Sequence, residues 1–564
     1  MQEIKNQLAK LISDLLKLDV KETEFTDTPN SEVGDLALPL FRYAKELKKN
    51  PKELADQIIS QVKSEIVSKV EFSGGYLNFF IKTEYLNKIV LEQDLSIPRQ
   101  AQDDKSKIMI EYSQPNTHKE FHVGHLRNAC LGASLVNMYR YLGSEVISAN
   151  YIGDAGVHIA KCLWGLKRYH EKDDIPENKG AYLGEIYTRA VRELEANSDL
   201  MDEVSDIQKT LERGDKELVE LWQETKKWSL DNFYRIYNLL NIKFDQWFWE
   251  SEEEKVGRKV VEKLIKENKV KEIKASEGAI IADLREYNLE VLVLIKSDGN
   301  VLYGTKDLPL GKKKFDEFGI DKSIYVVDNR QSLYMKQIFK LLDLIGYENK
   351  TKIHVPYDFV TLPEGAMASR KGNVVTFEDF YNEIFEKAKD ETEKRHLDWS
   401  ESKIRLVAEK VSLSAIKFNM LKYDNNSVIV FDVNKALSFD GDTGPYLLYT
   451  LARINSIINK IPNLTFEMIK DNYGLLSDRW EHDLILQLAK FEEVVQKSAE
   501  NYSPIILCTY LLEIAQLYNN FYHNCPVIKA EANLQQARLV LSKKTKDCLE
   551  KGLNLLNIDI LQEM

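Results

Sequence analysis

The sequence predicts a multidomain protein of the α/β plus all-α class. With 564 residues the chain is too long for one hydrophobic core, so three or four domains are expected. Strand-like and helical patterns alternate from about residue 106 to 385, which is typical of an α/β domain with a parallel sheet. Residues 386–564 read as helical with few glycines, and residues 1–100 form a separate mixed unit.

The first unit, residues 1–100, has the pattern of a small α+β domain. Helical patterns over Ile4–Leu18 and Pro51–Val67 flank an acidic loop, and a strand-like run covers Glu71–Lys82. The polar stretch Arg99–Lys107 is interpreted as a linker to the next domain.

The α/β unit begins with a β-α-β pattern. A strand is predicted over Lys107–Tyr112, and a helix with apolar residues at i, i+3 and i+4 spacing starts at Leu126 and ends before Gly143. The next strand covers Val146–Ala149. The loop Asn150–His158 follows its carboxyl end, where ligands bind in open α/β sheets.

The composition changes at about residue 160. Residues 160–275 are charged, helical by pattern and rich in Trp and Tyr, and are interpreted as an insertion whose aromatic residues form its own core. The second half of the α/β unit then follows as four strands and a helix that ends at Gly346: Val291–Lys296, Val301–Tyr303, Ser323–Val327, Gln331–Ile345 (the helix) and Ile353–Pro356.

Composition indicates an ordinary globular protein. Lys and Arg number 77 against 89 Asp and Glu, a net charge of −12, so any basic surface must be local. The N-terminal helix pattern lacks the apolar centre of a signal peptide, and no apolar run reaches the roughly 18 residues of a membrane span. The cysteines are scattered without a CxxC pair, which favours a cytoplasmic location and argues against structural zinc: Cys130, Cys162, Cys508, Cys525 and Cys548.

The segment Lys119–His125 (KEFHVGH) is the first candidate site, because it joins a predicted strand to a helix N-terminus. Free backbone N–H groups and the helix dipole favour phosphate there, and His122 and His125 can donate hydrogen bonds to phosphate oxygens. Gly124 would let a flat base approach the backbone. The two histidines could equally form a metal site or lie unremarkably on the surface, and Lys119 could be a solvated lysine.

A second candidate site is the loop Glu364–Val375 (EGAMASRKGNVV), about 240 residues downstream. It brings Ser369, Arg370 and Lys371 together in a glycine-bounded basic loop, which suits a polyphosphate that must later leave. Alone, the loop could also be a solvated basic turn.

In this order and spacing, HVGH and the basic loop resemble the HIGH and KMSKS motifs of class I aminoacyl-tRNA synthetases. The flanking segments resemble the arginyl-tRNA synthetase family: Glu111–Asn116 (EYSQPN), His125–Asn128 (HLRN), Tyr303–Asp307 (YGTKD), Arg330–Leu333 (RQSL), Asp442–Tyr446 (DTGPY) and Ala452–Ile454 (ARI).

The resemblance implies a three-part architecture. Residues 1–100 would be an N-terminal domain that binds the D-loop and elbow of tRNA, residues 106–385 a Rossmann-like catalytic domain, and residues 386–564 a helical anticodon-binding domain. It also implies a ligase that activates L-arginine with ATP, in the presence of tRNA, and transfers it to the 3′-terminal adenosine of tRNA(Arg). Magnesium is expected with ATP, and a cytoplasmic monomer is expected.

Site residues follow from the resemblance position by position. The expected catalytic residues are Lys119, His122, His125, Arg370 and Lys371. The expected ATP-binding residues are His122, Gly124, His125, Met367, Ser369 and Lys371. The expected arginine-binding residues are Glu111, Asn116, Tyr303, Asp307 and Gln331. The expected tRNA-binding residues are Tyr76 and Asn78 in the first unit and Tyr446 and Tyr449 in the helical unit.

Each of these side chains has a simpler alternative. Asp307, placed on a strand and loop after Tyr303, could be a helix N-cap, and Glu111 could pair with Arg127. Tyr76 could pack within its sheet, and Tyr446 and Tyr449 could belong to a buried helix face.

Two positions depart from the family pattern. The basic loop has Ala366 where class I enzymes have lysine, and Lys119 is expected to replace that charge. Tyr334 stands where the family more often has histidine, and no consequence is predicted for it.

Two rival functions remain. A nucleotidylyltransferase of the same fold would need neither terminal unit, and a non-catalytic relative would be expected to lack Glu111, His122, His125 or Asp307, which are all present.

Overall fold

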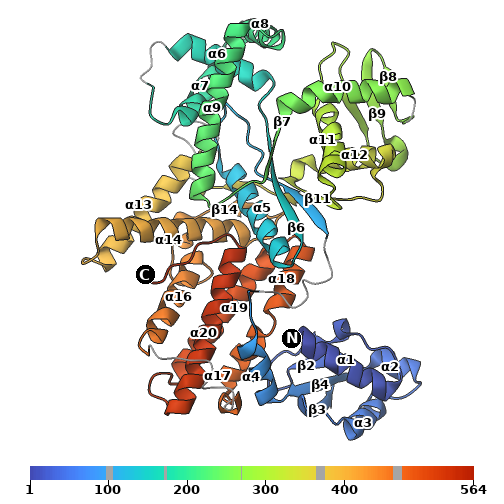
Figure 1. The fold of residues 1–564 in the computed structure, drawn as a ribbon, viewed down its shortest axis with the longest axis vertical. Coiled ribbons are helices and arrows are strands. Elements are labelled where there is room, and N and C mark those ends of the chain that lie inside the picture. The colour runs from blue at the N-terminus through green and yellow to red at the C-terminus, as the bar shows by residue number, and fades with distance from the viewer. Residues whose placement is uncertain (97–105, 171–174, 268–269, 364–374, 462–472) are drawn as a thin grey trace.

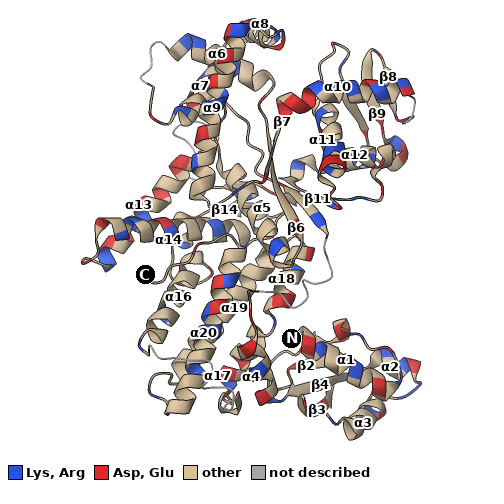
Figure 2. Ribbon diagram, in the orientation of Figure 1, with Lys and Arg blue, Asp and Glu red and all other residues tan. Residues whose placement is uncertain are grey.

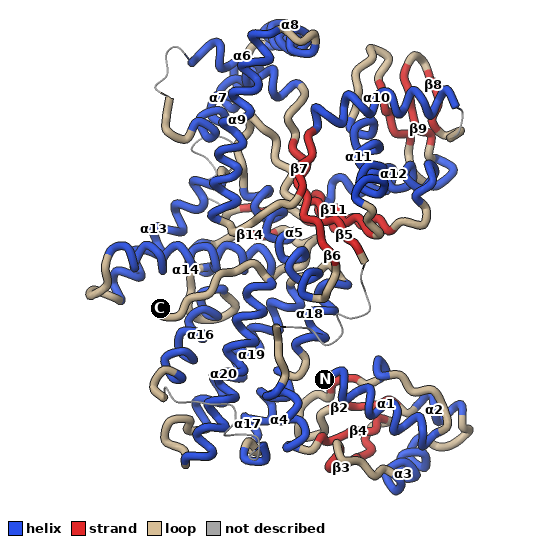
Figure 3. The backbone as a smooth tube through the Cα atoms, in the orientation of Figure 1, coloured by secondary structure: helices blue, strands red, loops and turns tan. Residues whose placement is uncertain are grey.

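The computed structural model describes residues 1–96, 106–170, 175–267, 270–363, 375–461 and 473–564. The predicted architecture is confirmed: a small α+β unit, a parallel-sheet α/β unit with an insertion, and a helical unit follow one another along the chain (Figure 1). Strands are concentrated in the N-terminal unit, the central sheet and one small sheet beside it (Figure 3).

The N-terminal unit is a four-stranded antiparallel sheet covered by helices, with strand order β1-β2-β4-β3. Its strands are β1 (Thr26–Asp27), β2 (Leu36–Pro39), β3 (Val67–Ser73) and β4 (Tyr76–Ile81), and its helices α1 (Gln2–Leu16), α2 (Phe41–Glu46), α3 (Pro51–Gln61) and α4 (Thr83–Glu92). The single strand predicted over Glu71–Lys82 is wrong: it is a hairpin, because Gly74 and Gly75 adopt positive φ and turn the chain.

The central sheet has five parallel strands in the order β12-β11-β5-β6-β7. These are β5 (Lys107–Glu111), β6 (Glu145–Ile152), β7 (Gln246–Trp249), β11 (Lys322–Asp328) and β12 (Thr351–Tyr357). Helix α5 (Val123–Tyr141) connects β5 to β6, and β5 also pairs with β11, so the strand order reverses at β5. Ligands bind beyond the carboxyl ends of the strands at such a reversal, and the HVGH segment, between β5 and α5, belongs to this edge.

The stretch predicted as a helical insertion contains three different parts. Helices α6 (Val157–Tyr169), α7 (Lys179–Ala196), α8 (Met201–Glu212) and α9 (Lys216–Leu239) pack around their own aromatic core, as predicted. The prediction of helix up to residue 275 is wrong, because β7 joins the central sheet and α10 (Glu250–Glu267) leads to a second sheet.

This second sheet is small and antiparallel. It consists of β8 (Ile273–Ser276), β9 (Ala279–Asp283) and β10 (Val291–Ile295), against which α11 (Tyr303–Phe318) and α12 (Ser332–Leu342) pack. The strand predicted over Val291–Lys296 therefore lies outside the central sheet. The strand predicted over Val301–Tyr303 is wrong, since Val301 makes only an isolated bridge and Tyr303 begins α11.

The described residues 375–461 and 473–564 are mainly helical. The helices are α13 (Phe377–Arg395), α14 (Glu401–Leu421), α15 (Val433–Ala436), α16 (Gly444–Ile458), α17 (Arg479–Leu488), α18 (Phe491–Glu500), α19 (Ile505–Asn524) and α20 (Ala532–Leu555). One short strand, β14 (Ile429–Val430), pairs in parallel with β13 (Val360–Thr361), which follows the central sheet. A search of the described helices found none with the length and apolarity of a bilayer span.

Polar contacts join the two terminal units. The Met1 amino group donates to the Ala489 carbonyl oxygen (2.6 Å), and the buried carboxylate of Asp35 meets His482 Nε2 (2.7 Å). Lysine and arginine are interspersed with aspartate and glutamate along the helices of all three units (Figure 2). The net negative charge is thus spread over the molecule.

Candidate functional site

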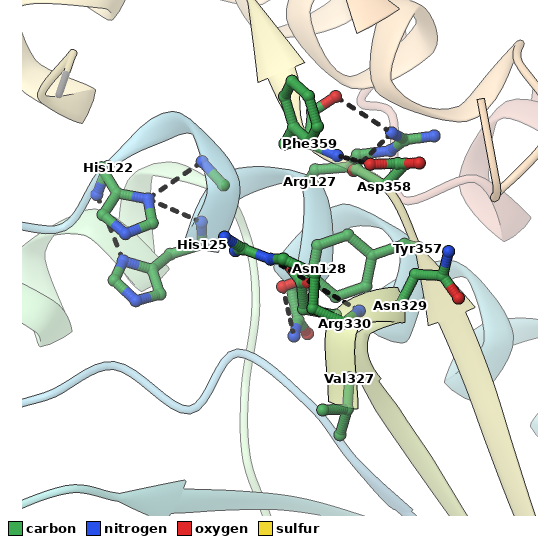
Figure 4. A network of polar contacts seen from close by, with 12 residues as sticks. His122, His125, Arg127, Asn128, Val327, Asn329, Arg330, Tyr357, Asp358 and Phe359 are labelled. Carbon is green, nitrogen blue, oxygen red and sulfur yellow. Dashed lines mark hydrogen bonds and ion pairs between the residues drawn. The ribbon is translucent and has the colours of Figure 1, made fainter. Parts of the chain in front are cut away.

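The two histidines of the HVGH segment cap helix α5 reciprocally (Figure 4). The backbone N–H groups of Gly124 and His125 donate to His122 Nδ1 at 3.1 and 3.3 Å, and the His122 N–H donates to His125 Nδ1 at 3.3 Å. The two imidazoles stack with ring centroids 3.7 Å apart and planes inclined by 19°. The start of the helix therefore holds both rings in one orientation.

This capping determines the tautomer of each ring. Because each Nδ1 accepts a hydrogen bond, the ring proton of each neutral imidazole is on Nε2. Burial keeps the rings neutral: it lowers the pKa of His122 to about 4 and that of His125 well below the ordinary value. Each ring therefore offers an Nε2–H donor, which suits a phosphate oxygen.

The expectation of free backbone donors at this helix start is wrong. The amides of Gly124 and His125 are taken by the imidazole, and the Val123 N–H donates to the Val375 carbonyl oxygen at 3.3 Å. Glycine is needed at 124 because a Cβ there would lie 2.9 Å from His122 Cε1. The space predicted for a flat base is thus used by the protein's own imidazole.

Lys119 lies beside these histidines and is partly buried. Its Nζ is 5.4 Å from the ring centroid of Tyr187 on α7, and burial lowers its pKa. After burial, the Lys119 charge is among the causes that lower the pKa of His122, His125 and His158. It is therefore a cation packed into the site and differs from the solvated lysine considered as an alternative.

The basic loop itself, with Ala366, Met367, Ser369, Arg370 and Lys371, lies outside the described residues. The chain that follows it does contact the first motif. Thr376 makes an antiparallel bridge with His122, and the Phe377 N–H donates to the Phe121 carbonyl oxygen at 2.8 Å. The end of the loop is therefore anchored at the histidine pair.

Arg127 and Asn128, one turn into α5, connect the motif to distant segments (Figure 4). The buried Arg127 guanidinium donates to the carbonyl oxygens of Asp358, Phe359, Asp424, Asn425 and Ser427. Asn128 accepts from the Ser113 N–H (2.6 Å) and donates to the Val326 carbonyl oxygen (2.9 Å). These contacts hold α5 to the strands on both sides of it.

The carboxylates of Glu111, at the end of β5, and Asp307 lie close enough to interact electrostatically. Glu111 pairs with the fully buried Lys314 Nζ of α11 (2.7 Å) and accepts from Gln114 Nε2 (3.1 Å). The alternative that Glu111 pairs with Arg127 is therefore wrong. The sequence analysis missed Lys314, because a lysine 203 residues away on a helix carries no local signal.

Asp307 is on helix α11, one turn after Tyr303, and not on a strand and loop. The N-cap alternative is also wrong, since Leu302 is the N-cap residue. Asp307 accepts a hydrogen bond from the Tyr334 hydroxyl group, and burial raises its pKa to about 7. Tyr334 was also missed as a site residue, although its departure from the family pattern was the signal that could have found it.

The other predicted arginine ligands differ in exposure and surroundings. Tyr303 is 69% exposed at the first turn of α11, and Gln331 is exposed at the start of α12. Asn116 bridges to Gly153, whose missing Cβ leaves room for the Asn116 side chain: a Cβ would lie 2.1 Å from its Oδ1.

The four candidate tRNA contacts differ in exposure. Tyr76 is 40% exposed and meets Phe41 edge to face, whereas Asn78 is only 7% exposed within the sheet. Tyr446 is partly buried and its hydroxyl group accepts from Asn519 Nδ2 (2.9 Å). Tyr449 is 43% exposed and lines a small pocket with Arg395, His396, Phe439 and Met564 among others.

Comparison with known proteins places this geometry in a class. A family model described as the catalytic domain of class I tRNA synthetases (R) matches residues 86–433. Models of the arginyl tRNA synthetase N terminal domain and the DALR anticodon binding domain match residues 2–81 and 447–564.

Full-length relatives give the particular family. The chain is 38% identical to an arginine–tRNA ligase of Bdellovibrio bacteriovorus, over 95% of this chain and 93% of that one. It is 34% identical to one of Halothermothrix orenii over the whole of both chains. The solved Thermus thermophilus arginyl-tRNA synthetase superposes with a TM-score of 0.84 at 28% identity, covering 99% of this chain and 100% of that one. The chain therefore belongs to the arginyl-tRNA synthetase family.

Proposed function

We propose that this protein joins L-arginine to tRNA(Arg) in two steps at one site. ATP and arginine form arginyl-adenylate and pyrophosphate, and the arginyl group then passes to the 3′-terminal adenosine of the tRNA. The observation that carries the proposal is the combination of two Nε2–H donors at the start of α5 with the neighbouring carboxylates of Glu111, at the end of β5, and Asp307 on α11. One set suits phosphate and the other suits a guanidinium group.

In this proposal the phosphate groups of ATP lie against His122 and His125, with Lys119 as the nearby cation. The neutral imidazoles donate hydrogen bonds that strengthen as charge develops on the phosphate oxygens. Met367, Ser369, Arg370 and Lys371 approach the pyrophosphate from the basic loop, and Gly124 is part of the same ATP site. The protein aligns the arginine carboxylate with the α-phosphorus and supplies no covalent intermediate.

Magnesium would enter with ATP. No group of three His, Cys, Asp or Glu side chains capable of holding a metal occurs among the described residues. At nucleotide sites Mg²⁺ is commonly carried mainly by phosphate oxygens, and we propose the same here. Bound there, magnesium would neutralise charge on the phosphates.

Arginine would be recognised by the shape of its guanidinium group as well as by its charge. Asp307 offers a carboxylate for the planar guanidinium fork, Tyr303 flanks it one turn earlier, and Glu111 contributes negative potential from β5. Asn116 and Gln331 would take the α-amino group or the outer guanidinium N–H groups. Replacing Asp307 with Asn should raise the arginine KM sharply with a smaller change in kcat, because a charge-assisted contact is lost.

The tRNA would contact both terminal units. Tyr76 and Asn78 are proposed for a D-loop base, and Tyr446 and Tyr449 for the anticodon; exposure favours the tyrosines Tyr76 and Tyr449 for stacking. We also propose that the enzyme acts as a cytoplasmic monomer with domain limits near residues 100 and 385.

The decisive experiment is ATP–pyrophosphate exchange with each of the twenty amino acids, with and without tRNA. Exchange with arginine alone among them, dependent on tRNA, is expected. Exchange with lysine or glutamine in place of arginine would contradict the proposal. Exchange without any amino acid would favour a nucleotidylyltransferase, and no exchange at all would favour a non-catalytic relative.

A further inference from the structure

Asp307 differs from its neighbours in having no cationic partner within the described part of the chain. The four lysines of α11 are engaged elsewhere: Lys314 with Glu111 (2.7 Å), Lys313 with Glu253 (3.1 Å), Lys312 with Asp316, and Lys306 with Glu250 (2.9 Å) and Glu254 (2.8 Å). Asp307 Oδ2 instead accepts from the neutral hydroxyl group of Tyr334. A partly buried carboxylate with a hydroxyl partner and no ion-pair partner is ready to receive a cation from outside.

Tyr334 is held firmly enough to act on this carboxylate. It is on the first turn of α12 and packs against two hydrophobic clusters, with Met335 on one side and the core of the small sheet on the other. Its hydroxyl group therefore reaches α11 from a rigid helix, three residues after Gln331.

We propose that Tyr334 is a positioning residue for arginine, which orients the Asp307 carboxylate by donating to Oδ2 and leaves Oδ1 for the guanidinium group. This inference rests on the proposed arginine–tRNA ligase function. It goes beyond it by assigning a role to a side chain outside the expected set of ligands.

The same contact controls the charge of Asp307. Burial raises its pKa to about 7, and the Tyr334 hydrogen bond acts in the opposite direction. The other groups that face it from the surrounding elements are Glu111 on β5, Tyr151 on β6, Glu250 on α10, Lys314 on α11, and Tyr303. At neutral pH the carboxyl group is thus near its midpoint of ionisation in the absence of arginine.

The sign of the pH dependence follows from linkage. Only the ionised carboxylate attracts the guanidinium group, so arginine affinity should increase as the pH rises through about 7 and then level off. Removing the Tyr334 hydroxyl group removes an interaction that lowers the Asp307 pKa. The midpoint should therefore move to higher pH, and the loss of affinity should be largest at neutral and lower pH.

The test uses Tyr334→Phe in the full-length enzyme, with arginine KM and kcat for tRNA charging measured from about pH 6 to about pH 8.5. We expect a rise in arginine KM of about tenfold near neutral pH, from one hydrogen bond to a charged group, and a smaller rise at the highest pH. The KM values for ATP and tRNA and the melting temperature should stay at the wild-type values.

Tyr347→Phe is a matched control. The Tyr347 hydroxyl group donates to Asp316 Oδ1 (2.6 Å), nine residues after Asp307 on the same helix α11, and its loss should leave arginine KM unchanged. A second comparison adds Tyr334→Phe to the Asp307→Asn enzyme. If Tyr334 acts through Asp307, no further rise in KM is expected there.

A wild-type arginine KM for Tyr334→Phe at every pH would overturn the inference. A rise of equal size at every pH would overturn it too, because it would indicate lost packing without control of the carboxylate. These two outcomes for Tyr334→Phe can be interpreted only if the wild-type enzyme charges tRNA with arginine. Failure of the wild-type enzyme to do so would instead reject the proposed function.

Discussion

Replacing Lys119 with alanine should separate catalysis from stability. Among the described residues, the direct contact recorded for the Lys119 ammonium group is the approach of its Nζ to the Tyr187 ring centroid at 5.4 Å. Such a cation–π contact is worth about 0.5–1 kcal/mol near a surface. Part of this loss of stability is offset, because the alanine variant no longer has the desolvation cost of a partly buried ammonium group. The folded state should therefore change in stability by about 1 kcal/mol at most.

The loss in activity should be far larger. A preorganised electrostatic group in a comparable site contributes roughly 2.7–4 kcal/mol to the transition state, or about 10²–10³ in rate. Residue 366 of the basic loop is alanine, so no lysine at this position can supply the charge. We therefore expect Lys119→Ala to reduce the rate of arginine activation by about that factor while arginine KM changes little.

The assay is single-turnover formation of arginyl-adenylate together with thermal unfolding of each variant. Lys179→Ala is the matched control, because Lys179 Nζ lies 4.9 Å from the Trp228 ring on the same insertion and is remote from the histidine pair. Ala366→Lys in the Lys119→Ala background should restore part of the rate. Activation by Lys119→Ala within a few-fold of wild type would refute the reasoning and assign the charge to Arg370 or Lys371.

Three further outcomes are expected. Lys314→Met should lower stability to urea unfolding by about 3–5 kcal/mol, because it leaves the Glu111 carboxylate buried without its cation (exposures of the pair are 0% and 5%); a midpoint equal to wild type would contradict this. Burial alone would lower the pKa of His482, but the hydrogen bond and charge of Asp35 raise it overall. The pair therefore stabilises the fold at low pH, and this stabilisation is lost as the pH rises through the raised pKa. The melting temperatures of wild type and His482→Gln should therefore differ most below about pH 6.5 and converge at alkaline pH. Tyr449→Ala should weaken tRNA binding by about fivefold or more in a filter-binding assay, since stacking contributes ~1–3 kcal/mol per base; an unchanged Kd would assign Tyr449 to packing alone.

The local features of the site could be predicted because each depends on a short continuous segment of sequence. A strand, two histidines and a helix follow one another within residues 107–141, and the structure has them in that order. The helix predicted over Gln331–Ile345 is also present, as α12 followed by a π-helical turn over Asp343–Tyr347, in which Gly346 adopts a φ of 107° that favours glycine.

Contacts between distant segments could not be predicted in the same way. The partners of Glu111 and Asp307 come from α11 and α12, and no periodicity indicates which lysine or tyrosine will meet which carboxylate. β7 was hidden because four aromatic-rich residues (QWFW) between long helices resemble a helix face as much as a strand. The hairpin at Gly74 was missed because its two strands read as one apolar run.

The contacts of Arg127 limit where the chain could be divided into separate fragments. Three of its five carbonyl partners, Asp424, Asn425 and Ser427, come from the turn after α14, and the strand that follows this turn pairs with β13. An enzyme cut anywhere between Phe359 and Asp424 would leave a buried guanidinium group with too few dipoles to solvate it, which is a severe penalty in a protein interior. The central sheet and the helical unit are thus joined through buried contacts of Arg127. Exchanging the helical unit for an unrelated one would require Arg127 to be replaced at the same time.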